Sequence, residues 1–178
     1  NIECINVALG NENKDLVLSQ ENFDSGTVSI DSNNRFLRFP EKIFQIITFQ
    51  KPIKYPIKQK TLDSLIENIN IDLIKIDVEG SEENVLLGYK KYIEKTSVII
   101  LEYGHFNLLN DFPLKKIYEE YGKNFYIGRI SNIKPYIKIS EKYNFLWDDF
   151  KCRNLVLINK DRKNHKTADF LLKNSIFI

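Results

Sequence analysis

Acidic side chains come directly after two apolar segments of this 178-residue chain. Lys75, Asp77 and Glu79 close the first segment, and Glu102 and His105 close the second. In open α/β sheets, ligands bind beyond the carboxyl ends of the strands, so both positions are candidate sites. A carboxylate placed there can orient a hydroxyl group or remove its proton, which is general base chemistry.

The spacing of Lys75 and Asp77 predicts an ion pair. Residues two apart on a strand share a face and lie roughly 6.6 Å apart, so Lys75 can reach Asp77 and hold it ionised. A lysine and an aspartate inside an apolar central strand are unfavourable unless paired, which is the main reason to suspect a site. A purely structural ion pair before a helix-capping turn, with Gly80 at a positive φ, is the alternative that stays open.

Two strands and one helix must position these side chains. Residues 71–78 form a nearly continuous apolar run, which predicts a parallel strand covered on both faces. Residues 97–103 predict a second strand, on which Glu102 points away from its two neighbours. Between the strands, Ser81 is expected to cap a helix that carries Glu82 in its positively charged first turn.

The rest of the pattern predicts an α/β fold in a single domain of residues 1–178. Further elements are expected as short strands at 2–9, 15–19, 26–30 and 44–49, helices at 61–70 and 113–121, and strands at Phe125–Ile130, 136–139 and 154–158. Strands that alternate with helices imply right-handed βαβ crossovers and a mostly parallel sheet. No helix pattern separates the last strands, which favours an antiparallel C-terminal hairpin at one edge.

Composition excludes several classes of protein. The net charge is +2, so we expect no nucleic-acid partner, and no apolar run approaches the roughly 20 residues of a transmembrane segment. Cys4 and Cys152 have no metal-ligand spacing, which favours free thiols in a reducing, cytoplasmic compartment; one disulfide between them stays open. The sequence gives no indication of the oligomeric state.

Several blocks together resemble the signature of FkbM-type methyltransferases. They are Thr-Leu-Asp-Ser-Leu at 61–65, Ile-Asp-Leu-Ile-Lys-Ile-Asp-Val-Glu-Gly-Ser-Glu at 71–82, Val-Leu-Leu-Gly at 85–88 and Val-Ile-Ile-Leu-Glu at 98–102. Asn-Val-Ala-Leu-Gly at 6–10 is similar to the family's segment after its third core strand. The resemblance covers the chain from its start to about Glu102.

The resemblance implies a class I, Rossmann-like methyltransferase fold that uses S-adenosylmethionine (SAM). It implies O-methylation of a hydroxyl on a sugar, glycolipid or polyketide-like small molecule. Ala8 and Leu9 would lie near the adenine, and Asp77 near the methyl group and the acceptor.

Four residues are then assigned to catalysis. We expect Asp77 to orient or deprotonate the acceptor hydroxyl, Glu79 and Glu102 to shape the pocket, and His105 to serve as an alternative base. Carboxylates of this kind could also bind Mg²⁺, but we expect no metal.

The sequence also departs from the family. No Gly-rich cofactor turn precedes Asn6, and the chain contains no Met, so we expect an N-terminally truncated domain that begins inside a longer gene product. Such a domain would leave a strand edge exposed beside residues 71–78. Two alternatives stay open: a non-catalytic methyltransferase-like binding or interaction module, and an obligate complex in which another chain supplies the missing strands.

Overall fold

The computed structural model describes residues 2–20, 29–30, 53–67, 70–148, 153–163 and 165–178. The strands are β1 (Ala8–Leu9), β2 (Lys14–Gln20), β3 (Ser29–Ile30), β4 (Ile53–Lys60), β5 (Ile71–Ile76), β6 (Thr96–Tyr103), β7 (Phe125–Ile130), β8 (Ile137–Ser140), β9 (Arg153–Asn159) and β10 (Ser175–Phe177). The helices are α2 (Leu62–Leu65), α3 (Glu82–Leu87), α4 (His105–Leu109), α5 (Leu114–Tyr121) and α6 (Lys166–Lys173), with 3₁₀ turns η1 (Ile93–Lys95) and η2 (Phe145–Trp147). The predicted strand at 44–49 lies outside the described residues.

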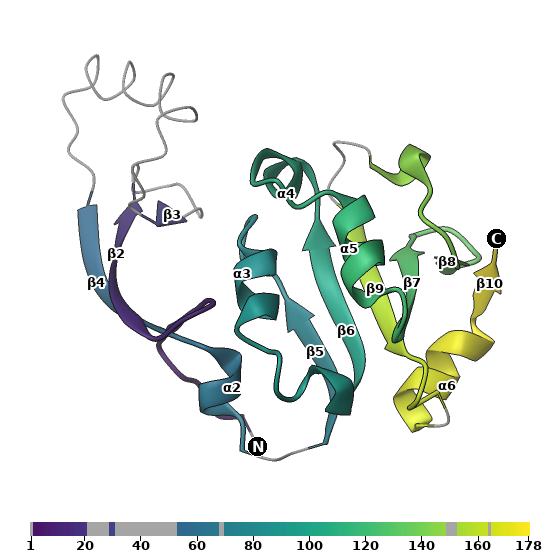
Figure 1. Ribbon diagram of the computed structural model, residues 1–178, viewed down its shortest axis with the longest axis horizontal. Helices are drawn as coiled ribbons and strands as arrows, with labels where there is room; N and C mark the ends of the chain where they lie inside the picture. The colour runs from purple at the N-terminus through teal and green to yellow at the C-terminus, as the bar shows by residue number, and fades with distance from the viewer. Residues whose placement is uncertain (1, 21–28, 31–52, 68–69, 149–152, 164) are drawn as a thin grey trace.

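The larger sheet has six strands in the order β10-β8-β7-β9-β6-β5 (Figure 1). β5 and β6 are parallel, but β9 is antiparallel to both of its neighbours, β6 and β7. The predicted mostly parallel sheet is therefore wrong, and the sheet is mixed. The reason is that β9 inserts between β6 and β7, two strands that point the same way, and satisfies the edges of both.

The antiparallel pairing of the last strands is confirmed in part. β7 and β8 pair antiparallel, as the short connection predicts. The edge itself is formed by β10, which pairs parallel to β8 and was not predicted. Helix α6, which leads into β10, was also not predicted, because the basic residues just before it, among them Arg162 and Lys163, were interpreted as a solvated loop.

Helices cover the two faces of this sheet unequally. The larger core cluster packs Val85 and Leu86 of α3 and Ile117 of α5 against Ile99 and Leu101 of β6. Ala168 of α6, completely buried, packs with Val98, Val156 and Ile158 on the other face. In the described part of the chain, no helix is long and apolar enough to cross a membrane.

β5 lies at one edge of the described sheet, with β6 as its hydrogen-bonded neighbour there. Leu73 on this strand is 45% exposed, so the expectation of a strand covered on both faces is wrong. The expected exposed strand edge beside residues 71–78 is confirmed for the described residues. An apolar run indicates that a segment tends to form a strand, whereas burial of that strand depends on which other segments of the chain pack against it.

A second, four-stranded sheet in the order β1-β4-β2-β3 holds the N-terminal strands. The predicted strand at 2–9 is reduced to Ala8–Leu9, while the strand predicted at 15–19 is confirmed as β2. β4 was not predicted because Pro56 interrupts it. The proline is tolerated because, among the described residues, β1 pairs with β4 at Gln59 and Lys60 and no strand pairs with that edge of β4 at Pro56.

Two predicted helix caps are wrong. Neither Thr61 nor Ser81 accepts a capping hydrogen bond through its side chain. The backbone N–H of Thr61 instead donates to Asn13 Oδ1 at 2.8 Å, and α2 ends at Leu65, well short of residue 70. The short helix is held by tertiary contacts, because the Lys91 N–H donates to Asp63 Oδ2 at 2.9 Å.

A close backbone approach joins this smaller sheet to α3. A Cβ atom at Gly88, which follows α3, would lie 2.0 Å from the carbonyl oxygen of Gly10. The Asp63 N–H also donates to the Gly88 carbonyl at 3.0 Å. Only glycine leaves room for this junction, which explains why Gly88 interrupts the apolar stripe of the helix.

We therefore expect Gly88→Ala to lower the free energy of unfolding by about 1–3 kcal/mol, since two backbone segments must separate to admit the methyl group. Urea unfolding followed by circular dichroism measures this change. Lys90→Ala, an exposed position two residues away, is the matched control and should have a much smaller effect. Equal stability of the two variants would contradict the close approach.

Candidate active site at the ends of β5 and β6

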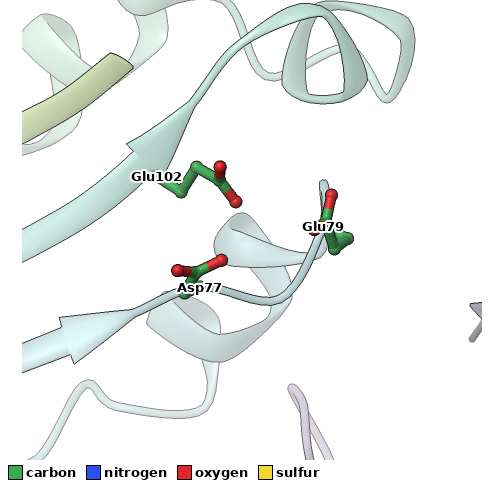
Figure 2. A group of neighbouring side chains, drawn as sticks. All are labelled: Asp77, Glu79 and Glu102. Carbon is green, nitrogen blue, oxygen red and sulfur yellow. The ribbon is translucent and has the colours of Figure 1, made fainter. Parts of the chain in front are cut away.

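The register of β5 and β6 brings two carboxylates together. The last ladder pair is Ile76 with Leu101, so the next residues, Asp77 and Glu102, come opposite each other where the strands end. Figure 2 shows Glu102 pointing from β6 toward Asp77, with Glu79 on the turn that follows. The structure thus brings together three of the four residues predicted for catalysis, and their catalytic role stays a prediction.

The predicted Lys75–Asp77 ion pair is present. The hydrogen bond from Lys75 lowers the pKa of Asp77, and the hydrogen bond from Glu102 lowers it further, so Asp77 is ionised. The argument that burial makes this pair costly is wrong, however. The two side chains are 49% and 43% exposed because β5 is an edge strand.

Glu102 lies beside Asp77, and its pKa is raised by that neighbour. The hydrogen bond to Asp77 raises the pKa of Glu102 to about 7, with further contributions from burial and from the negative charge of Asp77. Glu79 and Glu82 add smaller repulsions that act in the same direction. Two adjacent carboxyl groups therefore have opposite tendencies: one is a stable anion and the other a weak acid near neutrality.

The turn after β5 has a strained backbone. Glu79 adopts a φ of 51°, uncommon for a residue with a side chain, and Gly80 adopts a φ of 95°. A Cβ atom at Gly80 would also lie 2.7 Å from the Cβ of Phe106 in α4. The positive φ expected at Gly80 is thus confirmed, and the turn carries the Glu79 carboxylate back toward Asp77 even though the strand has ended.

The three carboxylates have a spacing that suits a cation. Asp77, Glu79 and Glu102 each offer an oxygen, and these oxygens lie within 4.8 Å of one another. A divalent ion would first have to displace the proton of Glu102 and compete with Lys75 for Asp77. The contacts among the described residues therefore favour proton chemistry at this cluster.

The remaining predicted residues lie elsewhere or outside the described part. Ala8 and Leu9 form β1 of the smaller sheet, although Leu9 packs against the core cluster that contains Ile76. His105 is the first residue of α4, and its side chain lies outside the described residues. The structure thus groups Asp77, Glu79 and Glu102, and does not group Ala8 or Leu9 with them.

Sequence reasoning missed two buried polar residues beside the site. Glu82, only 1% exposed, accepts a hydrogen bond from the Val78 N–H at 3.0 Å and from Asn107 Nδ2 at 2.6 Å. Asn107, only 3% exposed, accepts from the Gly104 N–H at 2.8 Å. The signal was available: Glu82 lies three and four residues before Val85 and Leu86, on the buried stripe of α3.

A second network holds β6 where it leaves the sheet. Tyr103 donates to Asp148 Oδ1 at 2.5 Å, and the Leu114 N–H at the start of α5 donates to Tyr103 at 2.7 Å and to Asp148 at 2.9 Å. Tyr143 donates to the other oxygen of Asp148 at 2.6 Å. Burial, together with the hydrogen bond to Asp148, raises the pKa of Tyr103, so it remains a neutral donor.

The comparisons with known proteins assign the chain to a class and then to a family. Residues 1–125 match the methyltransferase FkbM domain, so the chain is a methyltransferase-domain protein. Because the match covers more than half of its length, it belongs to the FkbM methyltransferase family, which confirms the resemblance drawn from residues 61–102. No curated protein and no solved structure matches the chain.

The Tyr103 network should contribute measurably to stability. Tyr103→Phe removes a buried donor from Asp148 and should lower the free energy of unfolding by about 1–3 kcal/mol. Tyr143→Phe removes a donor from the same carboxylate at a site that is 37% exposed, and should lower it by less than about 1 kcal/mol. Urea unfolding of both variants checks the difference. A larger loss in Tyr143→Phe would contradict the arrangement.

The proton on Glu102 predicts a pH dependence of stability. Its pKa rises from an ordinary 4.5 to about 7 on folding, so between these values the folded protein binds more protons than the unfolded chain. Its contribution to stability is complete below 4.5 and is lost as the pH rises through 7. Asp77, with a lowered pKa, is ionised in both states over this range and adds no slope.

Glu102→Gln removes this titration while keeping a neutral side chain of similar shape. Unfolding free energies of the wild type and the variant, measured by denaturant titration from pH 4.5 to 7, should therefore differ in slope. We expect the wild type to lose stability over that range relative to Glu102→Gln. Parallel curves would show that Glu102 titrates as it does in the unfolded chain.

Proposed function

We propose that this protein transfers a methyl group from SAM to a hydroxyl oxygen of a sugar, glycolipid or polyketide-like small molecule. Its FkbM family membership supports methyl transfer in general. The observation that carries the proposal is the ionised Asp77, held by Lys75 and facing the protonated Glu102 at the ends of two parallel strands. A hydroxyl acceptor needs such an oriented hydrogen-bond acceptor.

The described residues fit SAM chemically. When bound, SAM supplies a methyl group on a positively charged sulfur, and the ionised carboxylate of Asp77 would stabilise that charge. Ala8 and Leu9 are apolar and half-buried, as residues beside an adenine ring would be. Asp77 would lie beside the sulfur, while Ala8 and Leu9, on the smaller sheet, would lie near the adenine. We infer the class I, Rossmann-like arrangement from the position of Asp77 beyond the end of β5.

Asp77 and Lys75 have different roles in the proposed reaction. Asp77 accepts the hydrogen bond of the acceptor hydroxyl and orients its oxygen, and Lys75 keeps Asp77 ionised so that it remains available. The exposure of Asp77 allows the acceptor to reach it. Positioning of this kind accounts for much of the rate of a bimolecular transfer, since the reactants no longer have to find the reactive geometry by chance.

Glu102 and Glu79 surround Asp77 and complete the pocket. Glu102, protonated below about pH 7, keeps Asp77 in place through their shared hydrogen bond. As the pH rises, Glu102 ionises and gains the ability to accept the hydroxyl proton itself. His105, at the start of α4, stays the alternative base of this proposal.

The test uses the full chain with radiolabelled SAM and a panel of free sugars, glycolipids and macrolide-type alcohols as acceptors. SAM binding by calorimetry and label transfer to one acceptor class are expected. No SAM binding and no transfer to any of them would favour the non-catalytic module.

With an accepted substrate, Asp77→Asn should lower turnover by about 10²–10⁴-fold, because the amide cannot accept the proton. Asp72→Asn is the matched control, since Asp72 lies on the same strand but pairs with His165 at 3.0 Å. It should leave turnover near the wild-type value. Normal turnover in Asp77→Asn would refute the assignment of Asp77.

A further inference from the structure

The hydrogen-bonded ladder between β5 and β6 ends one residue before Asp77 and Glu102. Ile76 and Leu101 form its last pair. β5 enters the strained turn of residues 77–80, and β6 continues to Gly104 and α4. Backbone pairing alone therefore does not hold Asp77 beside Glu102.

A buried side-chain relay connects the two ends instead. After β5, the Val78 N–H donates to Glu82 at 3.0 Å. Asn107 Nδ2 donates to Glu82 at 2.6 Å, and after β6 the Gly104 N–H donates to Asn107 Oδ1 at 2.8 Å. Asn110 Nδ2 adds a hydrogen bond to the Gly80 carbonyl at 2.9 Å. Glu82 and Asn107 are almost fully buried, so water cannot replace their partners.

We propose that Glu82 and Asn107 are positioning residues that hold the ends of β5 and β6 at one separation and so keep the Glu102 carboxyl group beside Asp77. This role rests on the proposed function of the Asp77–Glu102 pair. Neither Glu82 nor Asn107 reaches the acceptor, because the bonds described above already use the oxygens of both side chains.

The hydrogen-bond donors and acceptors of the relay have a fixed order, which makes the relay testable. Glu82 supplies two acceptors, while Asn107 supplies a donor toward Glu82 and an acceptor toward Gly104. Exchanging the two groups, with Glu82→Gln and Asn107→Asp together, keeps every bond, because the Gln amide donates to an Asp that still accepts from Gly104. Asn107→Ala breaks the relay without changing any charge.

The readout is the midpoint of the Glu102 titration, followed by NMR of ¹³C-labelled glutamate carboxyls and assigned with Glu102→Gln. The groups that face Glu102 are Lys75 on β5, Asp77 and Glu79 on the segment that follows β5, and Glu82 on α3. In the wild type the midpoint is expected near 7, against an ordinary 4.5. In Asn107→Ala it should fall toward 4.5, and in the exchanged double variant it should return to near 7.

Glu83→Gln is the control. It removes a charge from the same turn of α3, but Glu83 pairs with Lys116 at 2.5 Å and makes no contact in the relay. Its midpoint should stay near the wild-type value. Circular dichroism confirms folding, and if Asn107→Ala unfolds, the double variant alone decides, since only a working relay restores the wild-type midpoint.

A midpoint near 7 in folded Asn107→Ala, or a low midpoint in a folded double variant, would overturn the proposal. The titration needs neither methyl donor nor acceptor. A negative result is therefore distinct from a failure of the methyl-transfer proposal, which the turnover of Asp77→Asn tests separately.

Discussion

The buried carboxylate of Glu82 is the contact on which the candidate site depends. Asp77 and Glu102, the carboxyl groups proposed to act in catalysis, lie one residue beyond Ile76 and Leu101, the last pair of the ladder between β5 and β6. Glu82 satisfies the Val78 N–H and the amide of Asn107, so the turn after β5 and the first turn of α4 share one buried anchor. A buried polar group is stable only when all its bonds are made, which leaves this corner of the fold a single arrangement.

From that anchor outward, the environment of each carboxyl group decides its chemistry. Glu82 is buried and accepts hydrogen bonds from the Val78 N–H and from Asn107. Glu102 is half-exposed and, beside a fixed negative charge, becomes a weak acid near neutrality. Asp77 is exposed, bonded to Lys75 and ionised. Three similar side chains within a few residues of two strand ends thus provide an anchor, a proton holder and an anion.

The local part of this arrangement could be predicted from sequence. Strand alternation correctly paired Lys75 with Asp77 and set Glu102 apart from its buried neighbours, and the apolar runs located β5 and β6. These features depend on residues one or two positions apart. The positive φ at Gly80 could likewise be predicted, because a turn between a strand and a helix so often requires glycine.

The long-range part could not be predicted, for physical reasons. The insertion of β9 beside β6 depends on pairing between residues 50 to 60 positions apart, for which the apolar pattern gives no register. Strand β4 was not predicted because it contains Pro56. The free-energy cost of a proline in a strand depends on whether a neighbouring strand needs the N–H group that proline lacks. From the sequence alone, the position of Glu82 is explained by the favourable interaction of an acidic side chain with the first turn of a helix. Its hydrogen bond with Asn107, 25 positions later, is seen only in the folded structure.

Family membership explains why such an anchor matters for function. A methyltransferase works mainly by positioning, so a displacement of the strand ends would change the acceptor geometry even with every reactive side chain present. One physical claim underlies this proposal: Glu102, whose pKa is raised to about 7, is protonated below neutral pH beside the ionised Asp77.

Isotope-edited infrared spectroscopy tests this claim most directly. Spectra of the protein with ¹³C-labelled glutamate, recorded at pH 6 for the wild type and for Glu102→Gln, report protonated carboxyl groups separately from carboxylates. The account predicts a protonated glutamate band in the wild type that is missing from Glu102→Gln, because the pKa of Glu102 is about 7. A wild-type spectrum at pH 6 without that band would show Glu102 ionised and would contradict the account.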